Sequence, residues 1–108
     1  MKQIAISLAV LMLVWGGDAK AKPKVFYDSG NTLLSKCTSK SQVPEMYCVG
    51  YIIGVVDASN LVCPENTVNV GQLKDIVIKY LKENPATRHY NATGLVQISL
   101  APLFPCKK

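Results

Sequence analysis

Four cysteines are the residues of this sequence with the most evident capacity for chemistry: Cys37, Cys48, Cys63 and Cys106. An even number of cysteines in a short chain with an export signal is typical of disulfides formed in an oxidising compartment. A zinc site would need ligands paired at short spacing, and this sequence has no C-x-x-C pair and a single histidine, His89. We therefore predict two disulfides and neither a metal nor any other cofactor.

Helix geometry limits how the cysteines can pair. Cys48 lies in a predicted helix that ends near Asn60, twelve residues further on, a distance of roughly 18 Å. The three residues from there to Cys63 can span back only about 10 Å, whereas bonded cysteines need Cα atoms within about 7 Å. This disfavours Cys48 with Cys63. We prefer Cys37 with Cys48 and Cys63 with Cys106, while the crossed pairing, 37 with 63 and 48 with 106, stays open.

The other polar residues do not form a pattern typical of an enzyme. Catalysis needs a nucleophile beside a base, paired carboxylates or a metal, and oxidised cysteines are not nucleophilic. We interpret His89 as a connector residue and Arg88 as an anchor to a helix end. Asp57 is an acid in an apolar helix, and unpaired burial would be costly, so it should reach solvent, a hydrogen-bond donor or a dimer partner. We predict no enzymatic activity.

The first residues of the chain have the pattern of a secretory signal. Lys2 gives a positive start, residues 4–15 are apolar, and residues 19–21 form an A-x-A cleavage site. Twelve apolar residues are too few to cross a bilayer, which takes roughly 20. We predict a signal peptide over residues 1–21, cut after Ala21, and one domain over residues 22–108 with no membrane attachment after cleavage.

The exported part is small and moderately basic. Without residues 1–21 it keeps ten Lys and Arg against six Asp and Glu, so its net charge is about +4. A domain of this size buries a modest core, and each disulfide would add about 2 to 4 kcal/mol of stability. The lysines are dispersed and no aromatic-basic motif stands out, so nucleic acid is not an expected partner.

The first two predicted helices contain the first two cysteines. A short helix runs from about Asn31 to Cys37, capped by Asp28 or Ser29, and a loop follows over residues 38–41. A second helix runs from Pro44 to about Asn60 and should form the centre of the core. The residues expected to form its buried stripe are Val49, Ile52, Ile53, Val56 and Asn60. Two glycines at small-x-x-x-small spacing, Gly50 and Gly54, are expected to allow tight packing within the domain.

Two more helices are predicted after a turn at residues 63–66. Asn69 and Gln72 are spaced like a capping box, and apolar residues at helical spacing continue to Leu81 before Asn84-Pro85 ends the helix. The apolar residues are Leu73, Ile76, Val77, Tyr80 and Leu81. The last helix covers about residues 92–103, and Pro102 should bend or end it near Ala101. The predicted fold is all-α: a small four-helix domain stapled by two disulfides.

Several short motifs follow one another over nearly the whole exported part. Residues 48–58 read CVGYIIGVVDA, and after them come Cys63-Pro64, Gly71-Gln72-Leu73, Lys79-Tyr80-Leu81, Pro85, Arg88-His89 and Phe104-Pro105-Cys106. Their order and spacing resemble the Rap/Tai family of type VI secretion immunity proteins. The resemblance implies a periplasmic, all-helical, often dimeric protein that binds a sister cell's peptidoglycan amidase effector and occludes its active-site cleft.

We therefore expect a periplasmic immunity protein whose partners are an amidase effector and a second copy of the chain. The alternative is a structural or adaptor protein of the cell envelope without a toxin partner, and a small periplasmic hydrolase is a third, remote class. Exposed polar loops are the expected contact surface. The candidate contact residues are Thr38, Ser39, Lys40 and Ser41 in one loop, and Asn84, Arg88, His89 and Tyr90 in the other.

Overall fold

The computed structural model describes residues 27–107, and they form four helices in the order α2 (Gly30–Cys37), α3 (Gln42–Ala58), α4 (Val70–Glu83) and α5 (Ala92–Leu100). Within this part of the chain, β-type pairing is limited to two isolated bridges. The all-α prediction is confirmed. The predicted signal peptide, residues 1–21, lies outside the described residues. None of the described helices combines the length and apolar character needed to cross a membrane.

Local capping explains where three of the helices begin. The side chain of Ser29 accepts a hydrogen bond from the Thr32 backbone N–H at the start of α2. Asn69 and Gln72 form the predicted capping box of α4, with both hydrogen bonds at 2.9 Å. Asn91 caps α5. Each cap satisfies backbone donors that the first helical turn leaves without a partner.

Helix α3 differs from its prediction in bounds and in orientation. It begins two residues before Pro44 and ends at Ala58 rather than near Asn60. Its buried residues are Cys48, Ile52 and Val55. Of the predicted stripe, Ile52 is therefore confirmed and Val49 and Val56 are half-buried, whereas Ile53 and Asn60 are exposed and were wrongly included. The physical reason is that α3 is apolar almost all round, and the bond from Cys48 to α2 decides which side turns inward.

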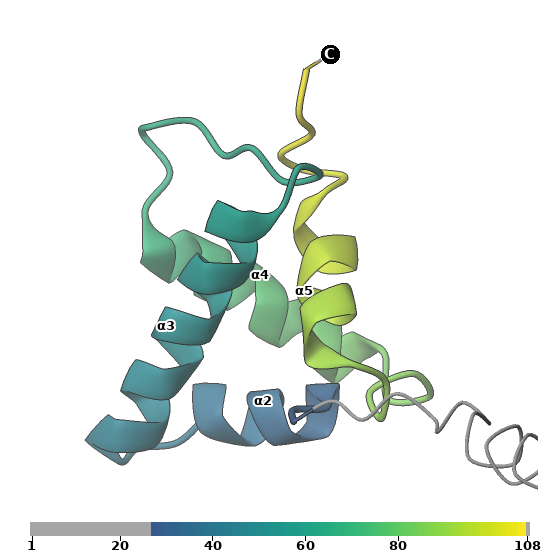
Figure 1. Ribbon diagram of the computed structural model, residues 1–108. Coiled ribbons are helices and arrows are strands. Elements are labelled where there is room, and N and C mark those ends of the chain that lie inside the picture. The colour runs from purple at the N-terminus through teal and green to yellow at the C-terminus, as the bar shows by residue number, and fades with distance from the viewer. Residues whose placement is uncertain (1–26, 108) are drawn as a thin grey trace, which may run out of the picture.

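All four helices pack against one another around one core. Figure 1 shows α2 at one end of the molecule, with α3 and α5 extending away from it and α4 behind them. The fully buried side chains come from every helix: Leu33, Cys48, Ile52, Val77, Leu81, Val96 and Leu100, with Val62 from the loop after α3. Helix α5 ends at Leu100, as Pro102 predicts.

The start of α2 lies unusually close to its neighbours. A Cβ added to Gly30 would lie 2.5 Å from Leu95 Cδ1 and 2.6 Å from the carbonyl oxygen of Arg88. No side chain larger than hydrogen fits there without moving backbone. Gly30 therefore permits the contact between α2 and the connector that follows α4.

The cysteines pair as the sequence favoured. Cys37 is bonded to Cys48 and Cys63 to Cys106, with Cα–Cα distances of 5.0 and 4.9 Å. The first bond joins the end of α2 to α3, and the second joins the loop after α3 to the segment that follows α5. The crossed pairing is wrong for this fold.

Candidate partner-binding surface

The first predicted contact loop, residues 38–41, turns the chain between α2 and α3. Thr38 Oγ1 donates to the carbonyl oxygen of Leu34 at 2.8 Å, and Ser39 Oγ accepts from the Ser41 backbone N–H at 3.1 Å. These bonds hold the loop backbone in one shape. Thr38, Lys40 and Ser41 are exposed, and Lys40 is the one charged residue of the loop.

The second predicted contact segment, residues 84–90, divides into anchors and exposed residues. Asn84 Nδ2 donates to the Tyr80 carbonyl at 2.8 Å and so closes the end of α4. Arg88 Nη1 donates to the Leu81 carbonyl at 3.2 Å, which confirms that Arg88 anchors the connector to a helix end. His89 and Tyr90 are exposed and meet edge to face, with ring centroids 4.4 Å apart.

Helix α2 brings the two segments to one edge of the molecule. At its start, Arg88 Nε donates to Asn31 Oδ1 at 2.9 Å and the Arg88 carbonyl accepts from the Asn31 backbone N–H. At its other end, Thr38 is the cap. Eight helical residues span roughly 12 Å, so the two predicted segments lie about that far apart (Figure 1).

A polar cluster that the sequence did not indicate holds this edge to α3 and α5. Asp28 is buried and accepts hydrogen bonds from the Tyr47 hydroxyl and from Lys36 Nζ, the latter at 3.3 Å. Lys36 Nζ also lies 3.6 Å from the centre of the Tyr47 ring. The hydrogen bond to Asp28, then burial and the charge of Asp28, raise the pKa of Tyr47 to about 12. Asp28 was expected only as a candidate cap.

The same cluster continues to α5. Tyr51 stacks on Tyr47 with ring centroids 6.0 Å apart, and the hydroxyls of Tyr51 and Thr93 lie 2.8 Å apart. Its members are separated by up to 65 positions in the chain. No local pattern in the sequence brings them together, so the cluster could be found only from the fold.

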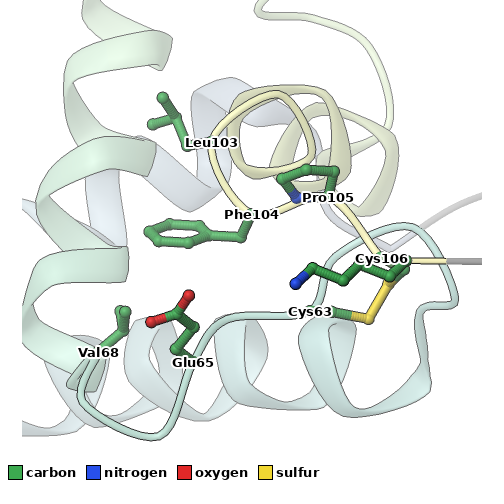
Figure 2. Close-up of a pocket in the computed structure, with 8 residues that line it drawn as sticks. Cys63, Glu65, Val68, Leu103, Phe104, Pro105 and Cys106 are labelled. Carbon is green, nitrogen blue, oxygen red and sulfur yellow. A yellow bond between two sulfur atoms is a disulfide. The ribbon is translucent and has the colours of Figure 1, made fainter.

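The hollowed parts of the surface lie elsewhere. One hollow of about 680 Å³ lies at the other end of the molecule, and none of the eight candidate contact residues lines it. Figure 2 shows Phe104 facing Val68 and Glu65 there, with the Cys63–Cys106 bond beside them. A second hollow, of about 330 Å³, lies on α3 beside Met46 and Gly50.

The sequence model of the Rap1a immunity proteins matches residues 29–106. The chain belongs to the Rap1a immunity protein family. No curated protein matches it. The Rap1a match begins at the cap of α2 and ends at Cys106, so it includes all four helices and both disulfides.

Membership of the Rap1a family suggests an immunity protein that binds a cognate effector. The two disulfides fit an exported protein, because such bonds persist in oxidising compartments. Among residues 27–107, no three His, Cys, Asp or Glu side chains are grouped so that they could hold a metal ion.

Proposed function

We propose that this protein is a periplasmic immunity protein that binds a type VI secretion peptidoglycan amidase effector and inhibits it sterically, protecting the cell against self or sibling intoxication. The observation that carries the proposal is the Rap1a match over residues 29–106. The sequence resemblance described above supplies the amidase as partner. Export through the signal peptide, with cleavage after Ala21, would bring the protein to the periplasm.

Steric inhibition needs a rigid surface rather than reactive groups. A surface held in its bound shape before contact loses little conformational entropy on binding, and so binds more tightly. Thr38, Ser39, Asn84 and Arg88 use their side chains to fix their own segments. In this proposal they position the contact residues, and Lys40, His89 and Tyr90 make the contact.

The first experiment captures the effector. Oxidised residues 22–108 are used as bait in a periplasmic extract, captured proteins are identified by mass spectrometry, and their peptidoglycan amidase activity is measured with and without the bait. Stoichiometric capture of an amidase that loses activity in the complex supports the proposal. Capture of envelope components alone, with the secretion system expressed, would favour the structural or adaptor alternative.

Paired variants locate the surface. Tyr90→Ala should weaken inhibition by roughly 30-fold if Tyr90 is a central contact, since such truncations cost about 2 kcal/mol or more. Leu103→Ala is the matched control, because Leu103 is similarly exposed but lines the hollow at the other end of the molecule. Lys40→Glu and Lys107→Glu form a second pair. If the two variants of either pair lose inhibition equally, the amidase does not bind at this surface.

We also propose that the protein pairs with a second copy of itself, as the sequence resemblance implies. Self-association and effector inhibition are separate properties, because one is measured with the purified chain alone and the other requires the amidase.

A further inference from the structure

The outer face of α3 is apolar and exposed along the whole helix. Val43, Met46 and Ile53 are 79%, 64% and 41% exposed. Gly50 lies between Met46 and Ile53, and Gly54 follows Ile53. A Cβ added to either glycine would meet nothing within 4 Å. The prediction that these glycines pack within the domain is therefore wrong, since nothing in the described chain covers them.

The spacing of this face is that of a helix-pairing seam. Positions 43, 46, 50, 53 and 57 follow steps of three and four, which place residues on one side of a helix. Asp57 is the one charged residue among them. A helix with an apolar face on both sides is normally covered on both sides, and here the inner face already packs against the core.

We infer that this face is where two copies of the chain pair, with α3 antiparallel to α3 of the second copy and Gly50 at the two-fold axis. The inference rests on the proposed homodimer and gives it an interface. Val43 and Asp57 each lie seven residues from Gly50, roughly 10 Å along the helix. Antiparallel pairing therefore sets Val43 against Asp57 of the second copy, and Met46 against its Gly54.

Small residues at the axis suit this arrangement. Without side chains at Gly50 and Gly54, two helix backbones can approach closely, and the long Met46 side chain finds room over the second copy's Gly54. Each contact occurs twice because the two-fold axis exchanges the copies. A face that supplies both halves of each contact fits a second copy better than an unrelated partner.

The charges of α3 also favour the antiparallel pair. Ser41, at the N-terminal end of α3, makes no side-chain capping bond, and Glu45, the acid of the first turn, pairs with Lys74 at 3.1 Å. At the other end Asp57 lies next to the helix C-terminus, where a negative charge is unfavourable. Antiparallel pairing brings the Asp57 carboxylate to the N-terminal end of the opposite helix, where backbone N–H groups and the helix dipole stabilise a negative charge.

One helix face buries less area than the roughly 800 Å² per partner of a standard interface, so we expect micromolar self-association. The test measures the mass of oxidised residues 22–108 by sedimentation equilibrium over a range of micromolar concentrations. Gly50→Glu should weaken dimerisation by roughly 100-fold or more, because it places two like charges at the axis. The monomer should stay folded, since a Cβ there meets open space.

Two further variants control for folding and charge. Gly94→Glu is the matched control, because Gly94 is also helical with nothing near its Cβ, and it should leave the dimer unchanged. Asp57→Lys should weaken dimerisation by about fivefold to tenfold, although a basic residue near the end of α3 should favour the isolated helix. Circular dichroism checks that each variant remains helical.

The outcomes separate this inference from the immunity proposal. A wild-type dimer that Gly50→Glu converts to a folded monomer supports the interface. A dimer that survives Gly50→Glu overturns this interface, and a wild-type monomer overturns the homodimer itself. If the wild type is a monomer and Gly50→Glu instead abolishes amidase inhibition, the face belongs to the effector and only the immunity proposal stands.

Discussion

The two disulfides belong to regions that are built in different ways. The Cys37–Cys48 bond lies in the core, where the two cysteines are 3% and 0% exposed. Cys63 is exposed and Cys106 half-buried, and their bond crosses the surface beside the hollow lined by Phe104. In the first region the sulfur atoms are part of the packing, whereas in the second they tie together two surface segments that are also joined by the hydrogen bond from the Cys63 N–H to the Phe104 carbonyl.

Loop length and burial rank the two bonds in opposite orders. Their sequence separations are 11 and 43, for which loop closure gives about 3 and about 4 kcal/mol respectively. Removing the buried bond also leaves a gap in the core, which costs roughly a further 1 to 2 kcal/mol. The buried bond should therefore contribute slightly more overall, although its loop is much shorter.

The largest expected effect is the loss of the core bond. The double variant Cys37→Ala, Cys48→Ala should lower the free energy of unfolding by roughly 4 to 5 kcal/mol, the sum of the loop-closure and packing costs. Urea denaturation followed by circular dichroism measures this change. A loss below about 3 kcal/mol would mean that the surrounding side chains close the gap and that burial adds nothing to the bond.

The surface bond should have a somewhat smaller effect. Cys63→Ala with Cys106→Ala should cost about 4 kcal/mol at most, because loop closure acts without a packing term. The four helices should keep their native circular dichroism, since neither cysteine of this bond lies in a helix. If this variant proves less stable than the core variant, loop length outweighs burial in this fold.

The different faces of α3 show what the sequence could predict and what it could not. Capping residues and periodic apolar positions act locally, so the four helices, the capping box at Asn69 and the end of α5 near Ala101 were predicted. An apolar helix, however, contains no periodic contrast from which to choose its buried side. The bond from Cys48 to Cys37 instead determines which side of α3 is buried. It turns Ile52 and Val55 inward and leaves Ile53 outside.

The positions of the two candidate contact segments could be predicted to a similar degree, while their role in binding stays a prediction. The loops were found because turn residues and prolines end helices locally, and Arg88 was correctly interpreted as an anchor. Which loop side chains remain exposed depends on distant partners, as with Arg88 and Asn31, which are 57 positions apart. The Asp28–Tyr47 contact depends on the fold in the same way.

The two bonds should also differ in their rate of reduction. A small dithiol at moderate concentration should reduce Cys63–Cys106 first, because a thiolate must reach a sulfur atom to attack it. Reaching Cys37–Cys48 requires the core to open, so its reduction should be roughly 100-fold slower, equivalent to about 2.7 kcal/mol. Alkylation followed by peptide mass spectrometry identifies the thiols released at each time. If the two bonds are reduced at equal rates in buffer, and urea does not change the ratio of these rates, both regions open together.

The smallest expected effect tests a second tie in the core region, the hydrogen bond from Tyr47 to Asp28. Tyr47→Phe should cost about 1 kcal/mol at neutral pH, because a partly exposed hydrogen bond contributes little more. Lys36 still pairs with Asp28 in this variant. Beside the Cys63–Cys106 bond, the corresponding hydrogen bond is one between backbone groups, from the Cys63 N–H to the Phe104 carbonyl at 2.8 Å, and a side-chain substitution does not remove it.

The pH dependence of the stability lost in Tyr47→Phe shows whether the hydroxyl causes the loss. The folded protein raises the pKa of Tyr47 to about 12, above the ordinary value of about 10, so folding favours the neutral hydroxyl that donates to Asp28. The contribution is therefore fully present below about pH 10 and is lost as the pH rises towards 12. The gap in unfolding free energy between wild type and Tyr47→Phe should shrink over that range, while other titrating groups affect both proteins equally. A gap that stays constant to pH 12 would assign the loss to packing of the tyrosine rather than to its hydroxyl.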